Sequence, residues 1–566
     1  MVLGIDLGTT NSLIACLRDG VPTPIPTVHG GYLTPSVVSV DQDDVVLVGE
    51  AARERLFTDP LRTAGSFKRL MGSTEEVRLG SRRFRAEDLS ALVLRSRKAD
   101  AEAYLQAPVT EVVISVPAYF NDQQRKATRL AGELAGLTVR RLINEPTAAA
   151  LLHGIHERDI DSKFLVFDLG GGTFDVSILE RFSGVMEVRA TGGDSFLGGD
   201  DFTEALVQWI GKAAPADARA AADPSYRAAL RFAAETAKRE LSTHTQWDVE
   251  MPRGASRARV TLTLAEYELA CARLVERLRA PIERALRDAR LRTTDLDEIV
   301  LVGGATRMPM VRRLAAQLFG RLPARHPDPD QTIALGAAVA AGLVARDAAF
   351  EELVLADVCP HSLGTAVAER DGQGGIMSDL FLPIIERNTV VPASRVRTLF
   401  TINDQQTRLR IDIYQGEARL CSKNTHLGGL ELSVPPRKAG EVRVDVRLTY
   451  DVNGILDVDI DSEEAGVKRN LVIKKLAGEV SDDEIERRRR ELAALRIHPR
   501  DEDENRLVLE RAERLFEQLL GAERERVGDY LKQFTLILER QDPHEIRVAR
   551  GEFARALDGL ERGSPW

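Results

Sequence analysis

The positions of hydrophobic and polar residues divide the chain into three regions. Up to about residue 350, short apolar runs that end in small residues alternate with segments whose apolar residues recur every three or four positions. These patterns are typical of strands and helices in an α/β fold. From residue 359 to about residue 480 apolar and polar residues alternate, which indicates antiparallel strands, and beyond residue 480 helical spacing returns. The sequence therefore predicts an α/β region, an antiparallel β region and a helical region.

Three predicted strands of the α/β region end in turns of small residues: "GIDLGTTNS" (4–12), "VFDLGGGTFD" (166–175) and "EIVLVGGATRMP" (298–309). The first two share one plan, an apolar strand followed by aspartate, Leu-Gly and small residues, which indicates two similar half-domains. Asp6 and Asp168 would place a carboxylate at the end of each strand, and turns without bulky side chains let backbone N–H groups approach a phosphate closely. We therefore expect these two turns to face one polyphosphate, with the third turn packing flat against a base or sugar.

Each of these turns, taken alone, is most often only a turn, so the hypothesis depends on all three occurring in order. The sequence contains neither GxxxxGK[ST] nor a GxGxxG that opens a helix. A P-loop and a dinucleotide-binding fingerprint are therefore excluded.

The β region contains a strong hairpin pattern. In "EVRVDVRLTYDVNGILDVDI" (441–460), apolar residues alternate with polar ones on both sides of Asn453-Gly454, a turn-forming dipeptide. "RLRIDIYQG" (408–416) predicts a further strand with one apolar face. Together they predict an antiparallel sandwich, whose core alone would explain the apolar faces.

Composition narrows the function classes. The 566 residues carry a net charge of −10 with both signs spread along the chain, so no basic field attracts nucleic acid or an anionic membrane. The four cysteines form no CxxC pair, which argues against a disulfide framework or a zinc site. The start, "MVLGIDLGTT", lacks the features of a signal peptide and favours the cytoplasm. The longest apolar run, 332–345, is too short to span a bilayer and predicts a buried helix.

These turns belong to a set of motifs that resembles those of actin-like ATPases and, more closely, the Hsp70 (seventy-kilodalton heat-shock) chaperone family. The motifs are "GIDLGTTNS", "VISVPAYFNDQQR" (113–125), "INEPTAAAL" (143–151), "FDLGGGTFDVS" (167–177), "LGGDDF" (197–202) and "VGGATR" (302–307). The resemblance covers most of the chain. It implies a two-lobed actin-like ATPase domain of ribonuclease H-like duplicated type (1–350), an interdomain linker (351–358), a peptide-binding β-sandwich (359–480) and a short helical lid (481–566). The implied function is an ATP-dependent chaperone that couples ATP hydrolysis to binding and release of unfolded polypeptide segments.

The resemblance also implies roles for individual residues. Asp6 and Asp168 would hold the hydrated Mg²⁺ that bridges the phosphates of ATP, since this hard cation prefers oxygen ligands. Lys68 would steady the γ-phosphoryl group, with Glu145 and Asp175 around the attacking water. The residues expected to surround the phosphates are Gly8, Thr9, Thr10, Asn11, Gly170, Gly171, Gly172 and Thr173. Without the resemblance, Lys68 would be interpreted as a solvated surface lysine.

The implied adenosine pocket contains Glu235, Lys238, Ser242, Gly303, Gly304 and Arg307, and Gly198, Gly199 and Asp200 complete the nucleotide contacts. A helix would place Glu235, Lys238 and Ser242 on one face. Without the resemblance, this would be interpreted as an exposed face with salt bridges. Asp200 stands where the family has the longer glutamate, so we expect different contacts across the cleft near it.

Residues 350–358, "FEELVLADV", resemble the family's linker, which pairs with a sheet in one state and is exposed in the other. The alternative is an ordinary edge strand. The linker residues of interest are Leu353, Val354, Leu355 and Asp357. Pro117 and Arg125 match positions that relay the nucleotide state, and Arg141 lies where co-chaperone docking is expected.

The implied peptide groove contains Thr365, Ala368, Phe400, Leu409 and Ile411. Thr365 and Ala368 replace larger apolar residues of the family, and Leu409 replaces a smaller valine. We therefore expect a narrower pocket and a weaker or more selective range of clients.

Ser481 followed by Glu484 forms a capping box that would open the helical region. This short region ends in "GSPW" and resembles that of the HscC-type bacterial branch. The implied ligands are ATP or ADP with Mg²⁺, together with K⁺. The implied partners are unfolded polypeptides, a J-domain co-chaperone and a nucleotide exchange factor, with the chain as a monomer or weak oligomer. A small-molecule kinase of the same superfamily, and a nucleotide-binding exchange factor without turnover, remain as alternatives.

Overall fold

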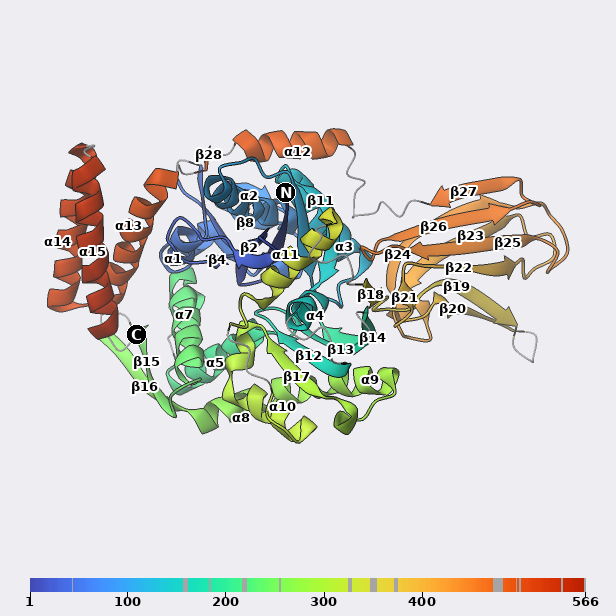
Figure 1. Cartoon of the computed structure of the whole chain (residues 1–566), viewed down its shortest axis with the longest axis horizontal. Helices are drawn as coiled ribbons and strands as arrows, with labels where there is room; N and C mark the ends of the chain where they lie inside the picture. The colour runs from blue at the N-terminus through green and yellow to red at the C-terminus, as the bar shows by residue number, and fades with distance from the viewer. Residues whose placement is uncertain are drawn as a thin grey trace.

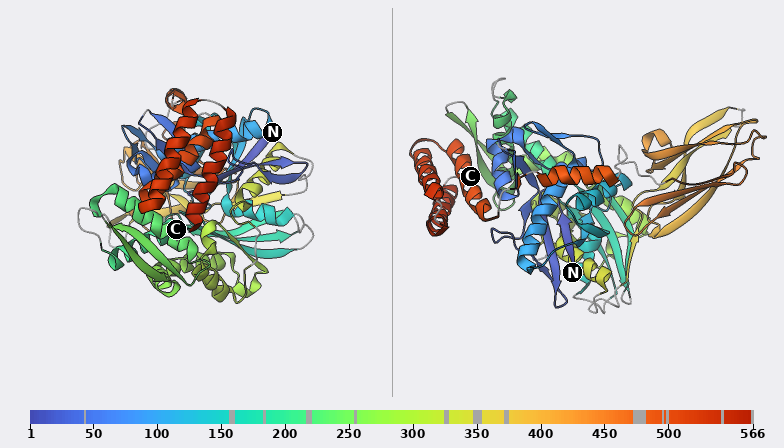
Figure 2. Two further views of the ribbon diagram at one scale, coloured as in Figure 1. Left: turned by 90° about the vertical axis from the view of Figure 1, so that its left-hand side faces the viewer. Right: turned by 90° about the horizontal axis from the view of Figure 1, so that it is seen from above.

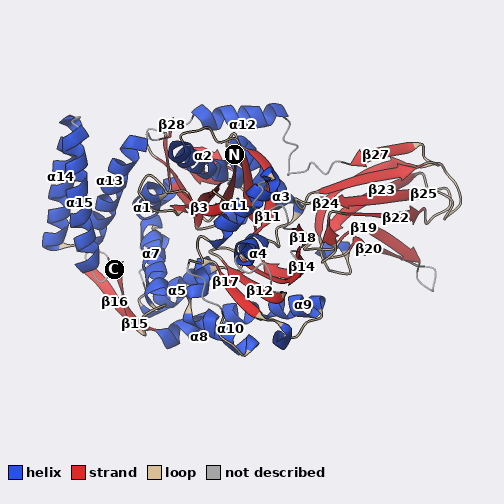
Figure 3. Ribbon diagram, in the orientation of Figure 1, coloured by secondary structure: helices blue, strands red, loops and turns tan. Residues whose placement is uncertain are grey.

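The computed structural model describes residues 1–42, 44–155, 161–182, 185–215, 221–253, 256–323, 328–346, 354–370, 375–471, 482–494, 496–497, 500–540 and 543–563. The α/β region lies in the middle of the molecule, the β region at one end and the last three helices at the opposite end (Figure 1). Figure 3 shows the predicted change from mixed structure to strands and then to helices along the chain.

A mixed sheet forms the core of what we call the first unit, residues 1–144. Its strand order is β11 (Thr138–Asn144), β10 (Glu111–Val116), β1 (Val2–Leu7), β2 (Asn11–Arg18) and β3 (Val21–Pro24), with β4 (Thr34–Pro35) also paired with β2. Around it lie α1 (Glu50–Thr58), the short helix η2 (Phe67–Leu70), α2 (Ala86–Leu105) and α3 (Asp122–Leu134). A smaller sheet contains β5 (Val37–Val40), β6 (Val45–Val48) and β7 (Thr63–Gly65), and β8 (Val77–Leu79) pairs with β9 (Arg82–Phe84). Central strands such as β1 are apolar almost throughout because both of their faces are buried.

A second mixed sheet forms the core of the second unit, residues 161–323. Its order is β17 (Glu298–Val302), β12 (Ser162–Leu169), β13 (Phe174–Phe182), β14 (Val185–Asp194), β18 (Val354–Val358) and β21 (Val390–Val391). The surrounding elements are α5 (Gly199–Ala213), α7 (Pro224–Glu240), β15 (Gln246–Arg253), β16 (Ser256–Thr263), α8 (Leu264–Arg277), α9 (Arg279–Ala289) and α10 (Pro309–Phe319). Both units begin with an antiparallel hairpin, β1–β2 or β12–β13, in which the first strand carries an aspartate near its end.

Two helices, α4 (Glu145–Ile155) and α11 (Thr332–Ala345), pack between the two units. A Cβ atom on Gly4 would lie 2.1 Å from the backbone nitrogen of Ala338, and one on Gly336 would lie 1.8 Å from the carbonyl oxygen of Ala148. Backbones approach this closely only where side chains are very small. The predicted buried helix at 332–345 is thereby confirmed, and its small residues bring the two sheets close together.

The β region consists of two four-stranded antiparallel sheets. Their orders are β20 (Ile376–Ile385), β19 (Leu363–Arg370), β23 (Arg408–Gln415), β24 (Thr425–Ser433), and β22 (Ala393–Phe400), β25 (Arg443–Tyr450), β26 (Leu456–Ser462), β27 (Val467–Leu471). Both sheets contribute to one apolar core. The predicted hairpin is confirmed as β25–β26, with a five-residue connection at 451–455 in which Gly454 has a φ of +71°.

The last four helices are α12 (Asp482–Ala494), α13 (Arg500–Gln518), α14 (Gly521–Arg540) and α15 (Pro543–Gly563). Two of them, α12 and α13, contact the first unit: Arg488 of α12 pairs with Asp88 at 2.6 Å, and Arg55 of α1 donates to Glu510 of α13 at 3.2 Å. The short strand β28 (Arg496–Ile497), between these two helices, pairs with β6. The last three helices have an apolar core of their own and lie across the end of both units, away from the β region (Figure 2). In this arrangement they do not cover the sandwich as a lid would. Ser481, the predicted cap, lies outside the described residues.

Candidate functional site

Five ionisable side chains meet in a buried cluster between the two sheets. Asp6 lies near the end of β1, Asp168 near the end of β12 and Asp175 near the start of β13, while Glu145 begins α4 and Lys68 lies on η2. Each is at most 9% exposed. Lys68 Nζ donates a hydrogen bond to Glu145 Oε1 at 2.7 Å. Four carboxyl groups therefore share one ammonium group in a space largely removed from water.

The carboxyl groups of this cluster have strongly raised pKa values. Burial, and then the charge of Glu145, raise the pKa of Asp6 to about 7 and that of Asp175 to about 7. Burial raises the pKa of Asp168 well above its usual value, and the neighbouring carboxylates add to the shift. A bound cation would oppose these shifts, because positive charge favours the ionised form of a carboxyl group.

The arrangement of Asp6 and Asp168 fits a magnesium ion that binds together with phosphates. Asp168 Oδ2 is buried without a hydrogen-bond partner among the described residues, while Asp6 Oδ1 accepts a hydrogen bond from Ser115 Oγ at 2.8 Å. In the part of the chain that the structure describes, no group of three or more His, Cys, Asp or Glu side chains is arranged to hold a metal. Mg²⁺ commonly takes one or two carboxylates and completes its shell with water and phosphate oxygens, so a two-carboxylate site suits it.

The two predicted phosphate turns lie against each other. A Cβ atom on Gly171 would lie 1.9 Å from Thr10 Oγ1, and one on Gly172 would lie 2.7 Å from Thr9 Cγ2. Within the second turn, Gly170 N donates to Thr173 O at 3.1 Å. In the first turn, a Cβ atom on Gly8 would lie 2.1 Å from the carbonyl oxygen of Asn11. The two turns therefore lie in contact, and a side chain on Gly171 or Gly172 would require Thr10 or Thr9 to move.

The start of α5 lies directly behind the second turn. Gly199 N donates to Gly170 O at 2.9 Å, and Asp200 N donates to Gly171 O at 2.8 Å. A Cβ atom on Gly198 would lie 2.5 Å from the backbone of Gly171. The shape of the phosphate turn therefore depends on this helix start.

The predicted adenosine residues gather around the same helix start. Lys238 Nζ donates to Gly199 O and to Thr203 Oγ1, both at 3.0 Å, and Thr203 Oγ1 donates to Glu235 Oε2 at 2.6 Å. Glu235 and Lys238 thus share one face of α7, as predicted. Ser242 lies beyond the end of α7 and so is not on the predicted helix face; its hydroxyl donates to Lys238 O at 3.2 Å.

The third predicted turn lies beside Asp168. Gly303 has a φ of +83°, and a Cβ atom there would lie 2.4 Å from Leu169 O, so the turn requires glycine. A Cβ atom on Gly304 would lie 3.0 Å from Asp330 Oδ1, and Arg307 pairs with Asp330 at 2.7 Å. Arg307 is therefore tied down at the edge of this turn.

Several polar residues of the site were not among those predicted from the sequence. Tyr119 N donates to Asp175 Oδ1 at 2.9 Å, and Ser36 Oγ donates to Gly8 O at 2.7 Å. The other missed residues are Ser66, Arg69, Ser115, Asp201, Thr203 and Asp330. Four of these eight residues, Ser115, Tyr119, Asp201 and Thr203, lie within or next to the motifs quoted above, so their position there was the available signal, whereas the other four lie outside those motifs.

A chain of buried polar contacts leads from the site toward the β region. Arg125 is 3% exposed, and its Nη2 donates to Asn144 Oδ1 at 2.6 Å and to the carbonyl oxygen of Ala118, the residue after Pro117, at 3.1 Å. Asn144 Nδ2 in turn donates to Asp357 Oδ2 at 2.9 Å. Arg125 Nη1 also donates to Asn453 O, at the tip of the β25–β26 hairpin, at 3.4 Å. Arg125 therefore contacts the sandwich directly and is linked through Asn144 to the strand that joins the two regions.

That joining strand, β18, is paired on both sides. It runs parallel to β14, where Leu355 faces Met186, and antiparallel to β21, where Asp357 faces Val391. The backbone of Val354 also pairs, whereas Leu353 lies outside the described residues.

Burial lowers the pKa of Arg141, and its Nε is buried without a partner among the described residues.

The five predicted groove residues differ in exposure. Phe400 is 51% exposed, and Ala368 and Leu409 are half-buried. Ile411 is fully buried in the sandwich core, and the buried Thr365 hydroxyl donates to Asp412 O at 2.9 Å. In this arrangement Thr365 and Ile411 are covered, so contact with a peptide would require the sandwich to rearrange.

Among the described residues, no helix combines the length and the apolar character that crossing a bilayer requires.

Comparison with known proteins gives one consistent result. The model of the family described as "Hsp70 protein" matches residues 2–79 and 74–535. The chain is 42% identical over 501 residues to the chaperone protein DnaK of Thermotoga petrophila, covering 86% of this chain and 82% of that relative. It is 43% identical over 487 residues to DnaK of Thermotoga neapolitana, covering 83% of this chain and 80% of that relative. It is 40% identical over 611 residues to the chaperone protein DnaK 1 of a Synechococcus species, covering 99% of this chain and 80% of that relative.

Proposed function

This chain belongs to the Hsp70 family, and from that premise we propose that the buried acidic cluster and its two glycine turns form the site at which it hydrolyses ATP. The chain is an ATP-dependent chaperone and an ATPase, and its family binds ATP or ADP with Mg²⁺. The observation that supports the assignment of the site is the cluster of four buried carboxyl groups around Lys68, between turns from two different sheets.

Each side chain of the cluster has a distinct place in this proposal. Asp6 and Asp168 would hold Mg²⁺, which supplies positive charge to the phosphate oxygens. Lys68, fixed by its ion pair with Glu145, would orient the γ-phosphoryl group and meet the charge that develops on it. Asp175, held by the Tyr119 amide, would orient the attacking water. The residues of both turns would offer backbone N–H groups to the phosphates.

We propose that the two units are the lobes of an actin-like ATPase domain at 1–350, followed by a linker at 351–358, a peptide-binding sandwich at 359–480 and a helical lid at 481–566. The paired β18 strand and the Arg125, Asn144 and Asp357 contacts support a docked state of the linker. ATP would favour this state, in which the lid is away from the sandwich, and hydrolysis would release the linker and close the groove.

The partners follow from the same proposal. Unfolded or extended polypeptides would bind the sandwich, a J-domain co-chaperone would dock near Arg141, and a nucleotide exchange factor and K⁺ would assist the cycle. We propose that the protein is located in the cytoplasm and that it is a monomer or a weak oligomer. The net charge of −10 supports the expectation that nucleic acid and anionic membranes are not partners.

Phosphate release from ATP by wild type, Lys68→Ala and the control Lys212→Ala tests the site. Lys212 is exposed on α5, so we expect wild-type turnover for that control and loss of most turnover for Lys68→Ala, with ATP still bound. Wild-type turnover by Lys68→Ala would contradict the proposed site.

Limited proteolysis between residues 351 and 358 tests the coupling. We expect ATP to protect this segment more than ADP does, in wild type and in Lys68→Ala alike. Equal cleavage with both nucleotides would contradict linker coupling.

A further inference from the structure

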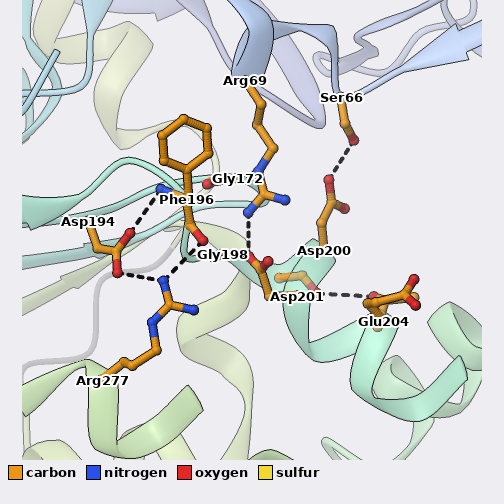
Figure 4. A network of polar contacts seen from close by, with 12 residues as sticks. Ser66, Arg69, Gly172, Asp194, Phe196, Gly198, Asp200, Asp201, Glu204 and Arg277 are labelled. Carbon is orange, nitrogen blue, oxygen red and sulfur yellow. Dashed lines mark hydrogen bonds and ion pairs between the residues drawn. The ribbon is translucent and has the colours of Figure 1, made fainter. Parts of the chain in front are cut away.

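Two side chains of the first unit reach across to the second unit beside the phosphate turn. Ser66 and Arg69 extend from the segment that contains η2, and Asp200 and Asp201 lie at the start of α5 (Figure 4). Ser66 Oγ donates to Asp200 Oδ2 at 2.5 Å. Arg69 Nη2 pairs with Asp201, and Arg69 Nε donates to Gly172 O at 3.1 Å. Arg69 thus joins the first unit to both the phosphate turn and the helix behind it.

The groups that Arg69 contacts are themselves held in place. Asp201 Oδ2 accepts a hydrogen bond from Gly198 N at 2.8 Å, which caps the start of α5. The carbonyl of Gly172 belongs to the turn that packs against Thr9, with no room for a side chain on Gly172. Because neither acceptor can move without disturbing the turn, the guanidinium fork of Arg69 fixes the distance between the two units at this point.

Arg69 directly follows Lys68 on the same short helix. That helix is preceded by Ser66 in the left-handed region, with φ of 56° and ψ of 16°, and closed by a hydrogen bond from Met71 N to Lys68 O at 3.1 Å. A displacement of Arg69 would therefore be transmitted to Lys68. Lys68 comes from the first unit and the phosphate turn from the second, and both must approach one phosphoryl group. Misplacement of such a group by about 1 Å can cost about a hundredfold in rate.

We propose that Arg69 is a positioning residue for ATP hydrolysis, which holds Lys68 at its working distance from the phosphate turn of the second unit. This inference rests on the proposed ATPase site. Ser66 and Asp200 form a second, smaller contact of the same kind, at the position where the family has glutamate.

The test compares wild type, Arg69→Ala, Arg69→Lys and Asp201→Asn. The control is Arg277→Ala, because Arg277 binds Asp194 at 2.7 Å and the Phe196 carbonyl at 3.3 Å, both within the second unit (Figure 4). Hydrolysis of prebound ATP in a single turnover is measured beside the equilibrium affinity for ATP and the unfolding temperature.

For Arg69→Ala we expect single-turnover hydrolysis to fall by about tenfold to a hundredfold, with a much smaller change in ATP affinity. Arg69→Lys keeps the charge but not the fork, so it should recover part of the rate. Asp201→Asn keeps an acceptor for Gly198 N and loses only the ion pair, so its smaller loss of rate should occur without a change in unfolding temperature.

Two results would overturn the proposal: hydrolysis by Arg69→Ala within twofold of wild type, or equal losses in Arg69→Ala and Arg277→Ala. A lower unfolding temperature with an unchanged rate would likewise show that the contact is only structural. Failure of the ATPase site itself would be seen separately, because Lys68→Ala would then turn over ATP like wild type.

Discussion

Removal of one arginine should release the C-terminal helices from the first unit. Arg514 of α13 is 7% exposed, and its guanidinium pairs with Glu54 of α1 and Glu561 of α15. It also donates to Gln518 Oε1 at 3.0 Å and lies 5.4 Å from the ring centre of Phe232 on α7. One side chain therefore connects α13 with both units.

The magnitude of the effect follows from the burial of Glu54. This carboxylate is 6% exposed, and Arg514→Ala would leave it without its closest cation. Breaking a buried ion pair by removing one partner costs about 3–5 kcal/mol. Arg53, at 3.8 Å from the other oxygen of Glu54, is 47% exposed and compensates only in part. We therefore expect about 3 kcal/mol, which corresponds to a shift of about a hundredfold in the docking equilibrium.

Hydrogen exchange measured by mass spectrometry would follow this change. The amides of α13 and α1 should exchange faster in Arg514→Ala, whereas α14 and α15 should keep most of their protection because the three helices share their own core. Arg550→Ala is a matched control, since Arg550 pairs with Glu504 and donates to Asn505 at 3.1 Å within the same bundle.

A double variant tests whether the unpaired buried charge of Glu54 causes the release. In Glu54→Gln with Arg514→Ala no unpaired charge remains buried, so protection should recover in part relative to Arg514→Ala alone. Wild-type exchange at both α1 and α13 in Arg514→Ala would refute the idea that this buried pair holds the helices in place.

Three further predictions concern the contact between the first unit and the β region, and the sandwich itself. Burial lowers the pKa of His361, whose Nε2 lies 3.0 Å from Tyr119 O. The undocked form therefore binds a proton more readily, so docking of the β region should weaken as the pH falls below about 6.5, measured by proteolysis of residues 351–358. His361→Asn should remove this pH dependence. Leu448→Ala, at a fully buried position, should lower the free energy of unfolding of the sandwich by about 2–5 kcal/mol in denaturant titrations, and a loss below about 1 kcal/mol would contradict its core position. Asn453→Ala removes the acceptor at 3.1 Å from Leu142 N and should cost about 1–3 kcal/mol of docking, seen as faster exchange of that amide; unchanged exchange would contradict the contact.

Much of the local structure could be predicted because it depends on neighbours in the chain. The alternation at 441–460 places Val446 and Leu448 on one face of any extended strand, and the structure buries both. An aspartate followed by small residues at a strand end likewise predicts a carboxylate beside an open turn, and Asp6 and Asp168 occupy such places.

The residues that hold the parts together could not be found in this way. Arg69 meets Asp201 across 132 positions of sequence, and Arg514 meets Glu54 across 460. Lys68 would be an exposed lysine by its local pattern, yet it is 3% exposed against Glu145.

The sequence by itself determined the three regions, the buried faces of their strands and helices, and the turns that carry carboxylates, since periodicity and turn chemistry act over a few residues. The tertiary structure alone decided that β18 pairs with the second sheet, that the last helices lie against the first unit and that Arg69 joins the two units. These contacts depend on which surfaces meet after the chain has folded, and charged residues along a chain do not specify their distant partners.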